Sequence, residues 1–255
     1  MNCNLIMHCG ARAVERPALG SVHTPEASAS WQPIPHLRLV EQVEHALEAS
    51  RLSVVNQAHS LSHDGHRYFG LMHIRNGHEN ADYAWVMGLR NSHDKTFPAG
   101  IVAGTQVFVC DNLAFGGEVK FARKHTRFIL RDLPLIAERA VARLVEKWHT
   151  QARRIAAYKE HALVDRDAHD LIVRALDLGV ISSRIVLPVL EQWRKPAHGA
   201  VAPRTAWSLF NGFTETMKGD SLMLLPKRTE ALHGLFDGFV GLAYRGADLV
   251  AAGVN

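Results

Sequence analysis

The hydrophobic pattern of this chain changes its period, and that change constrains the fold more than any other feature. Between residues 51 and 122, short runs rich in β-branched and aromatic residues are separated by turn sequences such as HDG at 63–65 and NGHEN at 76–80. From Asp132 onward, apolar residues recur every three or four positions, as in amphipathic helices. A β-rich first half followed by a helical second half predicts the α+β class.

The first half predicts one helix followed by an antiparallel meander of about five strands. We expect the helix at residues 36–50 and strands at 51–58, 66–75, 82–91, 105–110 and 118–122. A turn with the sequence DNLAFGG, at residues 111–117, should precede the last strand.

The second half predicts five helices. They are expected at residues 132–163, 167–179, from 182 or 183 to the KPAHG sequence, 205–218, and from about 229 onward. Asp167 is the expected N-cap of the second of these helices.

The chain contains no low-complexity linker and no internal repeat. We therefore expect an irregular N-terminal arm at residues 1–35 and a single α+β domain at 36–255. This domain should have a β-rich lobe at 36–130 and a helical lobe at 131–255.

Composition indicates a soluble, intracellular protein. The hydrophobic fraction of 47% and the charged fraction of 21% are ordinary for globular domains. Cys3, Cys9 and Cys110 are odd in number and lack CxxC spacing, which favours reduced thiols in the cytoplasm. The N-terminus does not resemble a signal peptide, and no apolar stretch approaches the roughly 20 residues that span a bilayer.

Motifs that would identify a reaction are missing from the sequence: it has no GxSxG, HExxH, Walker A or GxGxxG pattern. Ser92, His93 and Asp94 have the residue types of a catalytic triad. However, neighbouring side chains on an extended chain point to opposite sides, so a loop-closing turn is the preferred interpretation. We expect a non-enzymatic protein that needs no cofactor, and leave a catalytic role for these three residues open.

Two further groups have a functional and a structural interpretation. His59, His63 and His66 follow an H-x3-H-x2-H pattern that suits zinc or copper, but a hairpin would separate their rings. We favour solvated turn histidines and leave metal binding open. Asn211 and Glu215 lie four residues apart on a predicted helix, where the alternatives are a polar site and the edge of a packed helix.

The densest basic cluster of the chain runs from Val119 to Arg131 and continues into the following helix. Its cations are not interrupted by an acid: Lys120, Arg123, Lys124, His125, Arg127 and Arg131. Phe121 and Phe128 lie between them. Cations of this kind neutralise phosphates, while aromatic faces stack unpaired bases.

The cluster therefore predicts a nucleic-acid site. We expect contacts from Lys120, Phe121, Arg123, Lys124, Arg127, Phe128, Arg139 and Arg143. Lys147 continues the row of Arg139 and Arg143. The alternative is a solvated face whose aromatic residues belong to the core and whose charge is partly neutralised by Glu138 and Glu146. The formal net charge of +4 is too small to decide between the two.

The sequence resembles a family of uncharacterised phage/plasmid-like proteins, the domain of unknown function 932. The resemblance is carried by the segment GLRNSHDKTFPAGIVAGTQVFVCDNLAFGGEVKFARKHT at 88–126, with MHCGA at 7–11, PIPH at 33–36 and RTAWSLFNGFTE at 204–215. It implies a mobile-element setting and supplies no activity or site residues. The element order also resembles that of phage single-strand annealing proteins, which is an analogy of fold alone.

Two hypotheses follow. The first is a non-enzymatic, homo-oligomeric nucleic-acid-binding protein of a mobile element, which prefers single-stranded DNA and is related to recombination or annealing. The second is a protein-interaction module that modulates a host defence or replication factor.

Overall fold

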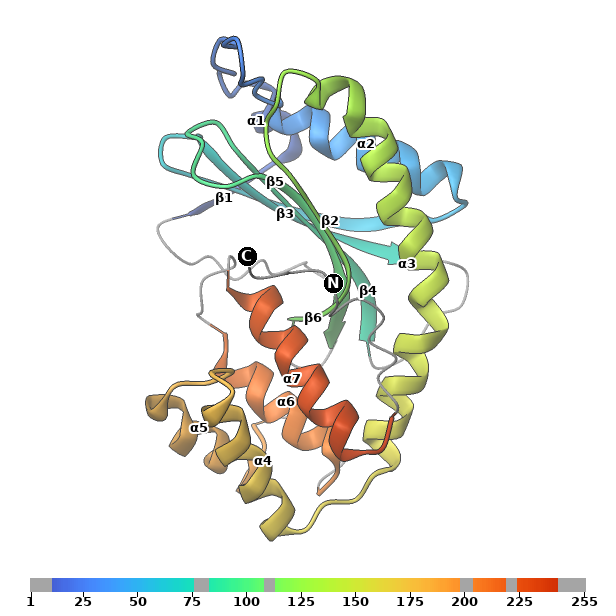
Figure 1. The fold of residues 1–255 in the computed structure, drawn as a ribbon, viewed down its shortest axis with the longest axis vertical. Coiled ribbons are helices and arrows are strands. Elements are labelled where there is room, and N and C mark those ends of the chain that lie inside the picture. Colours follow the sequence, from blue (N-terminus) through green and yellow to red (C-terminus); the bar gives the residue numbers. More distant parts are fainter. Residues whose placement is uncertain (1–10, 76–82, 108–112, 198–203, 219–223, 243–255) are drawn as a thin grey trace, which may run out of the picture.

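The structure is a computed structural model that describes residues 11–75, 83–107, 113–197, 204–218 and 224–242. It is an α+β fold: an antiparallel sheet flanked by helices is followed by a helical lobe (Figure 1). The elements are β1 Arg12–Val14, α1 Arg16–Gly20, α2 His36–Ala49, β2 Ser53–Ser62, β3 Arg67–Arg75, β4 Tyr83–Ser92, β5 Ala99–Val107, β6 Leu113–Arg123, α3 Ile129–Glu160, α4 Asp165–Asp177, α5 Ser183–Arg194, α6 Ala206–Thr216 and α7 Leu225–Phe239.

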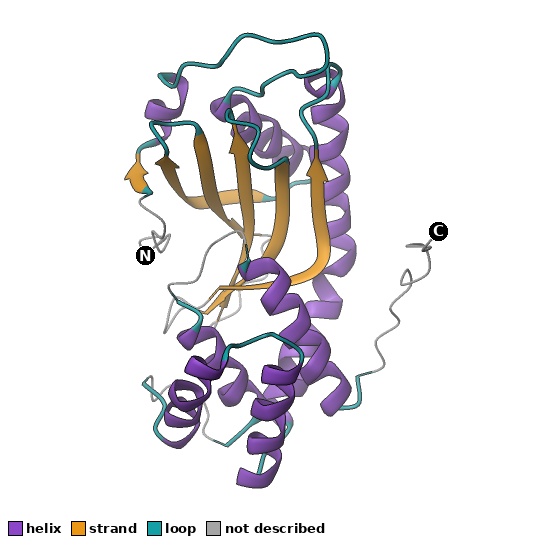
Figure 2. Ribbon diagram, turned by 60° about the vertical axis from the view of Figure 1, so that its left-hand side comes forward, coloured by secondary structure: helices purple, strands orange, loops and turns teal. Residues whose placement is uncertain are grey.

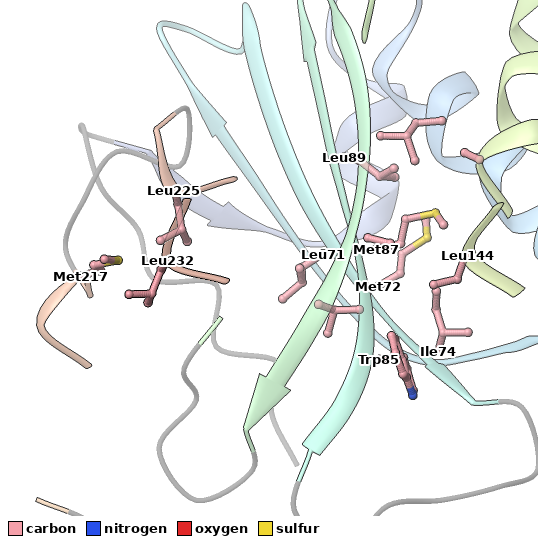
Figure 3. Close-up of a cluster of buried hydrophobic side chains, with 14 of the residues drawn as sticks. Leu71, Met72, Ile74, Trp85, Met87, Leu89, Leu144, Met217, Leu225 and Leu232 are labelled. Carbon is pink, nitrogen blue, oxygen red and sulfur yellow. The ribbon is translucent and has the colours of Figure 1, made fainter. Parts of the chain in front are cut away.

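The six strands follow one another in sequence order, each antiparallel to the next. Cross-strand pairs such as Met72 with Met87 and Ile74 with Trp85 share one face of the sheet. This face is buried against α2 and α3, where the rings of Trp85 and Trp148 lie 4.3 Å apart. Figure 3 shows these strand residues on the side of Leu144, whereas Leu71 points to the opposite side.

The long helix α3 links the sheet to the helical lobe. It packs on α2, on the edge strand β6 and on α6. Figure 2 shows it running along the side of the sheet and on to the helices below. Asp237 of α7 accepts hydrogen bonds from Arg154 Nε (2.9 Å) and Tyr158 Oη (2.6 Å) of α3. These three side chains are buried, and they join the two helices inside the lobe.

The predicted order of one helix, an antiparallel meander and a helical half is confirmed. The strand expected at 105–110 begins earlier, because β5 spans Ala99–Val107. Three further differences concern the arm, β6 and α4. The arm at 1–35 is not irregular throughout, because β1 pairs with β2 and residues Arg16–Gly20 form the helix α1, with Pro17 in its first turn. Strand β6 begins at Leu113, so its first half occupies part of the predicted DNLAFGG turn; residues 108–112 lie outside the described range.

The third difference concerns the start of α4. Asp167 is not its N-cap, because the helix begins two residues earlier, after Val164. The carboxylate of Asp165 instead accepts a hydrogen bond from Trp193 Nε1, at 2.8 Å. None of the helices in the described ranges is long and apolar enough to cross a membrane.

Candidate nucleic-acid interface

Strand β6 brings the first predicted residues to the edge of the sheet. The backbone of Lys120 pairs with that of Val102, and Phe121 pairs with Ile101. The side chain of Lys120 lies outside the described set. Phe121 is half-buried against the core, so little of its ring faces solvent. Arg123, at the end of the strand, is exposed.

The loop between β6 and α3 presents cations on its outside. Lys124 and Arg127 are exposed, whereas His125 between them turns inward and is buried. The Nε2 atom of His125 donates to Asn91 Oδ1 at 2.7 Å, which fixes the middle of the loop to the end of β4. The basic run of the sequence is therefore divided between a surface and a buried anchor.

Phe128 is the most exposed aromatic side chain of this surface. Its side chain is 43% accessible, although apolar rings are usually buried. The guanidinium carbons of Arg127 and Arg131 lie 4.4 Å and 4.6 Å from the centre of the ring, within cation–π range. An aromatic ring flanked by two guanidinium planes offers several flat faces on which a base can stack.

Helix α3 extends the surface as a row of cations spaced four residues apart. Arg127 lies in the turn just before the helix and Arg131 is the first cation on it; exposed Leu135 interrupts the row, and Arg139, Arg143 and Lys147 continue it. The first four cations are exposed, and Lys147 is half-buried. Each step advances about 6 Å along the helix axis and turns about 40° around it, so the row winds slowly across the solvent side.

Carboxylates neutralise only part of this surface. Asp132 pairs with Arg123 at 3.3 Å and with Arg131 at 2.9 Å. Glu146 reaches Lys147 only at 3.9 Å. Within the described part of the chain, no carboxylate pairs with Lys124, Arg127 or Arg139. The ion pairs of Asp132 and Glu146 lie at the surface and are therefore weak, so a phosphate can compete for their cations.

A buried polar network around Asn91 holds the loop against the body of the protein. The Nδ2 atom of Asn91 donates to the carbonyl of Ile34 at 2.6 Å and to His36 Nδ1 at 2.9 Å. His36 Nε2 in turn donates to the carbonyl of Gly65, and His93 Nε2 donates to that of Ile34, both at 2.8 Å. The rings of His36 and His93 stack with their centres 3.9 Å apart.

The three histidines of the network, His36, His93 and His125, are neutral near pH 7. Burial, followed by the proximity of the other imidazoles, lowers the pKa of His36 to about 3 and that of His125 to about 4. Burial also lowers the pKa of His93. Each ring therefore uses Nε2 as a donor in the neutral form, and the network adds no positive charge to the interface.

Ser92, His93 and Asp94 do not form a triad, and the turn interpretation is confirmed. Ser92 Oγ donates to the carbonyl of Phe97 at 2.7 Å, while His93 is engaged with Ile34. Asp94 accepts from Arg67 Nε at 2.6 Å and from the backbone of Thr96 at 3.1 Å. Ser92 and Asp94 thus close the turn after β4, whereas the side chain of His93 is hydrogen-bonded to the arm before α2.

The histidines at the β2–β3 hairpin also point to different partners. His59 is buried and lies 3.0 Å from Tyr68 Oη. His63 is exposed and contacts Arg67 at 2.9 Å. Within the described ranges, no three histidine, cysteine, aspartate or glutamate side chains gather to hold a metal ion.

Asn211 is part of a packed helix. It is buried, and its Nδ2 donates to the carbonyl of Trp207 one turn earlier, at 2.9 Å. Glu215 pairs at 2.6 Å with Lys218, in the turn just after the helix. This geometry agrees with a polar helix edge.

Sequence reasoning missed the buried network. Its members come from three separate places: the PIPH segment, the NSHD segment and the middle of the KHT sequence at 124–126. The available signal was that each segment carries a histidine, which the NSHD segment combines with Asn91. Nothing in the spacing connected them.

The family comparison covers most of this architecture. The family described as "Domain of unknown function (DUF932)" matches residues 26–231, which include strands β2 to β6, the loop after β6 and all of α3. The chain belongs to this family. The resemblance seen in the sequence is confirmed. Searches of curated proteins and of solved structures found no match.

Proposed function

We propose that this DUF932 protein binds nucleic acid, with a preference for single-stranded DNA, through the surface that runs from Arg123 along α3 to Arg143. The binding would serve a mobile genetic element, in the cytoplasm, without chemical change to the strand. Phe128 between Arg127 and Arg131 is the observation that carries the proposal. An exposed ring at the head of a cation row supplies stacking and phosphate contacts together.

The preference for single strands follows from the aromatic ring. In a duplex the base faces are covered by their neighbours, so only unpaired bases can stack on Phe128 or on the flanking guanidinium groups. The cations themselves bind the phosphates of either form. We therefore expect both forms to bind at low salt and the single strand to bind more tightly.

The test is a titration of labelled single- and double-stranded DNA of equal length at several salt concentrations. Each phosphate contact to a single strand should contribute about −0.7 to the slope of log K against log salt. The double variant Lys124→Glu/Arg127→Glu should weaken binding and flatten the slope. Both side chains are exposed, so the fold should be unaffected.

The matched control is Arg184→Glu/Lys195→Glu, which changes the net charge equally on exposed positions of α5 and its C-cap. If the interface is specific, the control retains nearly all of the affinity. Equal losses of affinity in both double variants would mean that the overall charge of the protein, and not this surface, determines binding. Failure of the unaltered protein to bind at low salt would refute the proposal.

A second candidate function is contact with a host protein. Val173, Leu178 and Leu187 are 54%, 60% and 60% accessible on α4, the turn after it and α5. Exposed apolar side chains of this kind occur at protein-binding surfaces. A partner captured equally well after nuclease treatment, and lost in Leu178→Ser/Leu187→Ser, would favour this function.

A further inference from the structure

The turn between β4 and β5 brings another cation to the loop that follows β6. Lys95 is exposed at the tip of this turn, and its φ of 64° lies in the left-handed region. Its Nζ lies 4.7 Å from the centre of the Trp31 ring. Lys95 and Trp31 are far apart in the sequence, and neither belongs to the basic run.

Trp31 connects this turn to the interface. Its ring lies 6.3 Å from that of His125, and the next residue, Gln32, donates its backbone N–H to the carbonyl of His125 at 3.1 Å. The arm before α2 is thereby fixed against the loop that presents Lys124 and Arg127. Lys95, Trp31 and Lys124 therefore belong to one end of the molecule.

The charge at this end also suits a phosphate. Asp94, the acidic neighbour of Lys95, is already engaged by Arg67 and by Thr96. Among the described residues, no carboxylate pairs with Lys95 itself. The contact of Lys95 with the half-buried indole is the kind that an ammonium exchanges readily for a phosphate, because its stem is flexible and its charge well hydrated.

We propose that a bound strand continues from the α3 row past Lys124 to a second contact formed by Lys95 and Trp31. Lys95 binds a phosphate there, and the indole face that it leaves takes one unpaired base. This inference rests on the proposed function and adds a path to it. The strand turns from the long helix across the loop to the end of the sheet.

The test compares single strands of different length, from about 4 to about 16 nucleotides, the range of site sizes known for single-strand-binding folds. Lys95→Glu should weaken binding of the longest strand by about tenfold. The negative slope of log K against log salt should become shallower by about 0.7, because one phosphate contact is lost. Binding of the shortest strand, which α3 alone can hold, should change much less. Trp31→Ala should show the same dependence on length.

Two variants guard this test. Lys159→Glu is the matched control, because Lys159 also lies over a tryptophan, Trp207, at 5.9 Å, but in the helical lobe. It should bind every strand like the unaltered protein. Lys95→Asn removes the charge and suits the left-handed backbone, so it separates loss of charge from strain in the turn. It should reproduce most of the loss with an unchanged melting temperature.

The outcomes separate the two proposals. If the unaltered protein binds but Lys95→Glu and Lys159→Glu match it at every length and salt concentration, the path is wrong and the α3 interface stands. The path is also wrong if Lys95→Glu weakens short and long strands equally. If the unaltered protein binds no strand at low salt, the proposed function fails, and the path with it.

Discussion

Phe128 is the residue on which the proposed interface depends most. Stacking of a base on an aromatic side chain contributes about 1–3 kcal/mol by alanine substitution. Phe128→Ala should therefore lower single-strand affinity by roughly 5- to 150-fold, since about 1.4 kcal/mol corresponds to a factor of ten. Fluorescence anisotropy measures this loss.

The free energy of unfolding should change by less than about 1 kcal/mol in the same variant, because a surface position contributes little to stability. Val173→Ala is the control, since it truncates a similarly exposed apolar side chain on α4. It should leave the affinity unchanged. An unaffected Phe128→Ala protein would show that the ring takes no part in binding.

The polar network around Asn91 joins β4, the start of α2 and the loop after β6, and it should make the stability of the protein depend on pH. His36, His93 and His125 have lowered pKa values in the folded protein, against about 6.5 in the unfolded chain. Below pH 6.5 the unfolded chain binds protons that the folded protein does not. The free energy of unfolding is therefore highest above pH 6.5. It falls as pH decreases toward the pKa of His125, about 4, and that of His36, about 3.

We expect the free energy of unfolding to fall between pH 6.5 and pH 4 by up to about 1.4 kcal/mol per pH unit for each of the three histidines. Urea unfolding at a series of pH values measures this slope. His125→Asn removes one titrating ring, so its slope should be smaller than that of the unaltered protein. An identical slope in both proteins would contradict the assignment to this network.

The elements themselves were largely predictable from the sequence, because hydrophobic period and turn residues are local signals. The long strands and helices carry many repeats of their period, and most of their positions agree with the structure. Strand β5 is the exception, because it spans Ala99–Val107 and was expected at 105–110. Strand β1 has only three residues, Arg12–Val14, too few to show a period, and its pairing with β2 is a tertiary effect. The prediction of Asp167 as an N-cap was wrong because aspartate is favourable inside the first turn of a helix as well as at its N-cap.

The site was less predictable than the fold. The exposed cations on α3 follow from the helical period, but the sequence could not show that His125 turns inward. Its partner Asn91 is 34 residues away, and the next partner of Asn91, His36, is a further 55 residues away along the chain. Contacts at such distances depend on the folded topology. The same holds for the contact between Trp31 and Lys95.

At the scale of the whole molecule, a buried ion pair joins α7 to α3, the helix that links the sheet to the helical lobe. Arg154 and Asp237 are almost inaccessible, and their closest nitrogen and oxygen lie 2.8 Å apart. Asp237→Ala leaves the guanidinium buried without its carboxylate and also removes the acceptor of Tyr158 Oη. Loss of one partner of a buried pair costs about 3–5 kcal/mol.

Thermal and chemical unfolding of Asp237→Ala should show this loss. Asp170→Ala is the matched control, because Asp170 forms an exposed pair with Arg174 on α4. Exposed pairs of this kind contribute less than about 1 kcal/mol. Comparable stability of the two variants would mean that the buried pair does not hold the lobe in place.

The central claim is that the surface from Arg123 to Arg143 binds single-stranded nucleic acid. The most direct measurement is the salt dependence of single-strand affinity for the unaltered protein and for Lys124→Glu/Arg127→Glu. The account predicts a steep, linear fall of log K with log salt, and a weaker affinity with a shallower slope in the double variant. An affinity that is independent of salt, or that is identical in the two proteins, would contradict it.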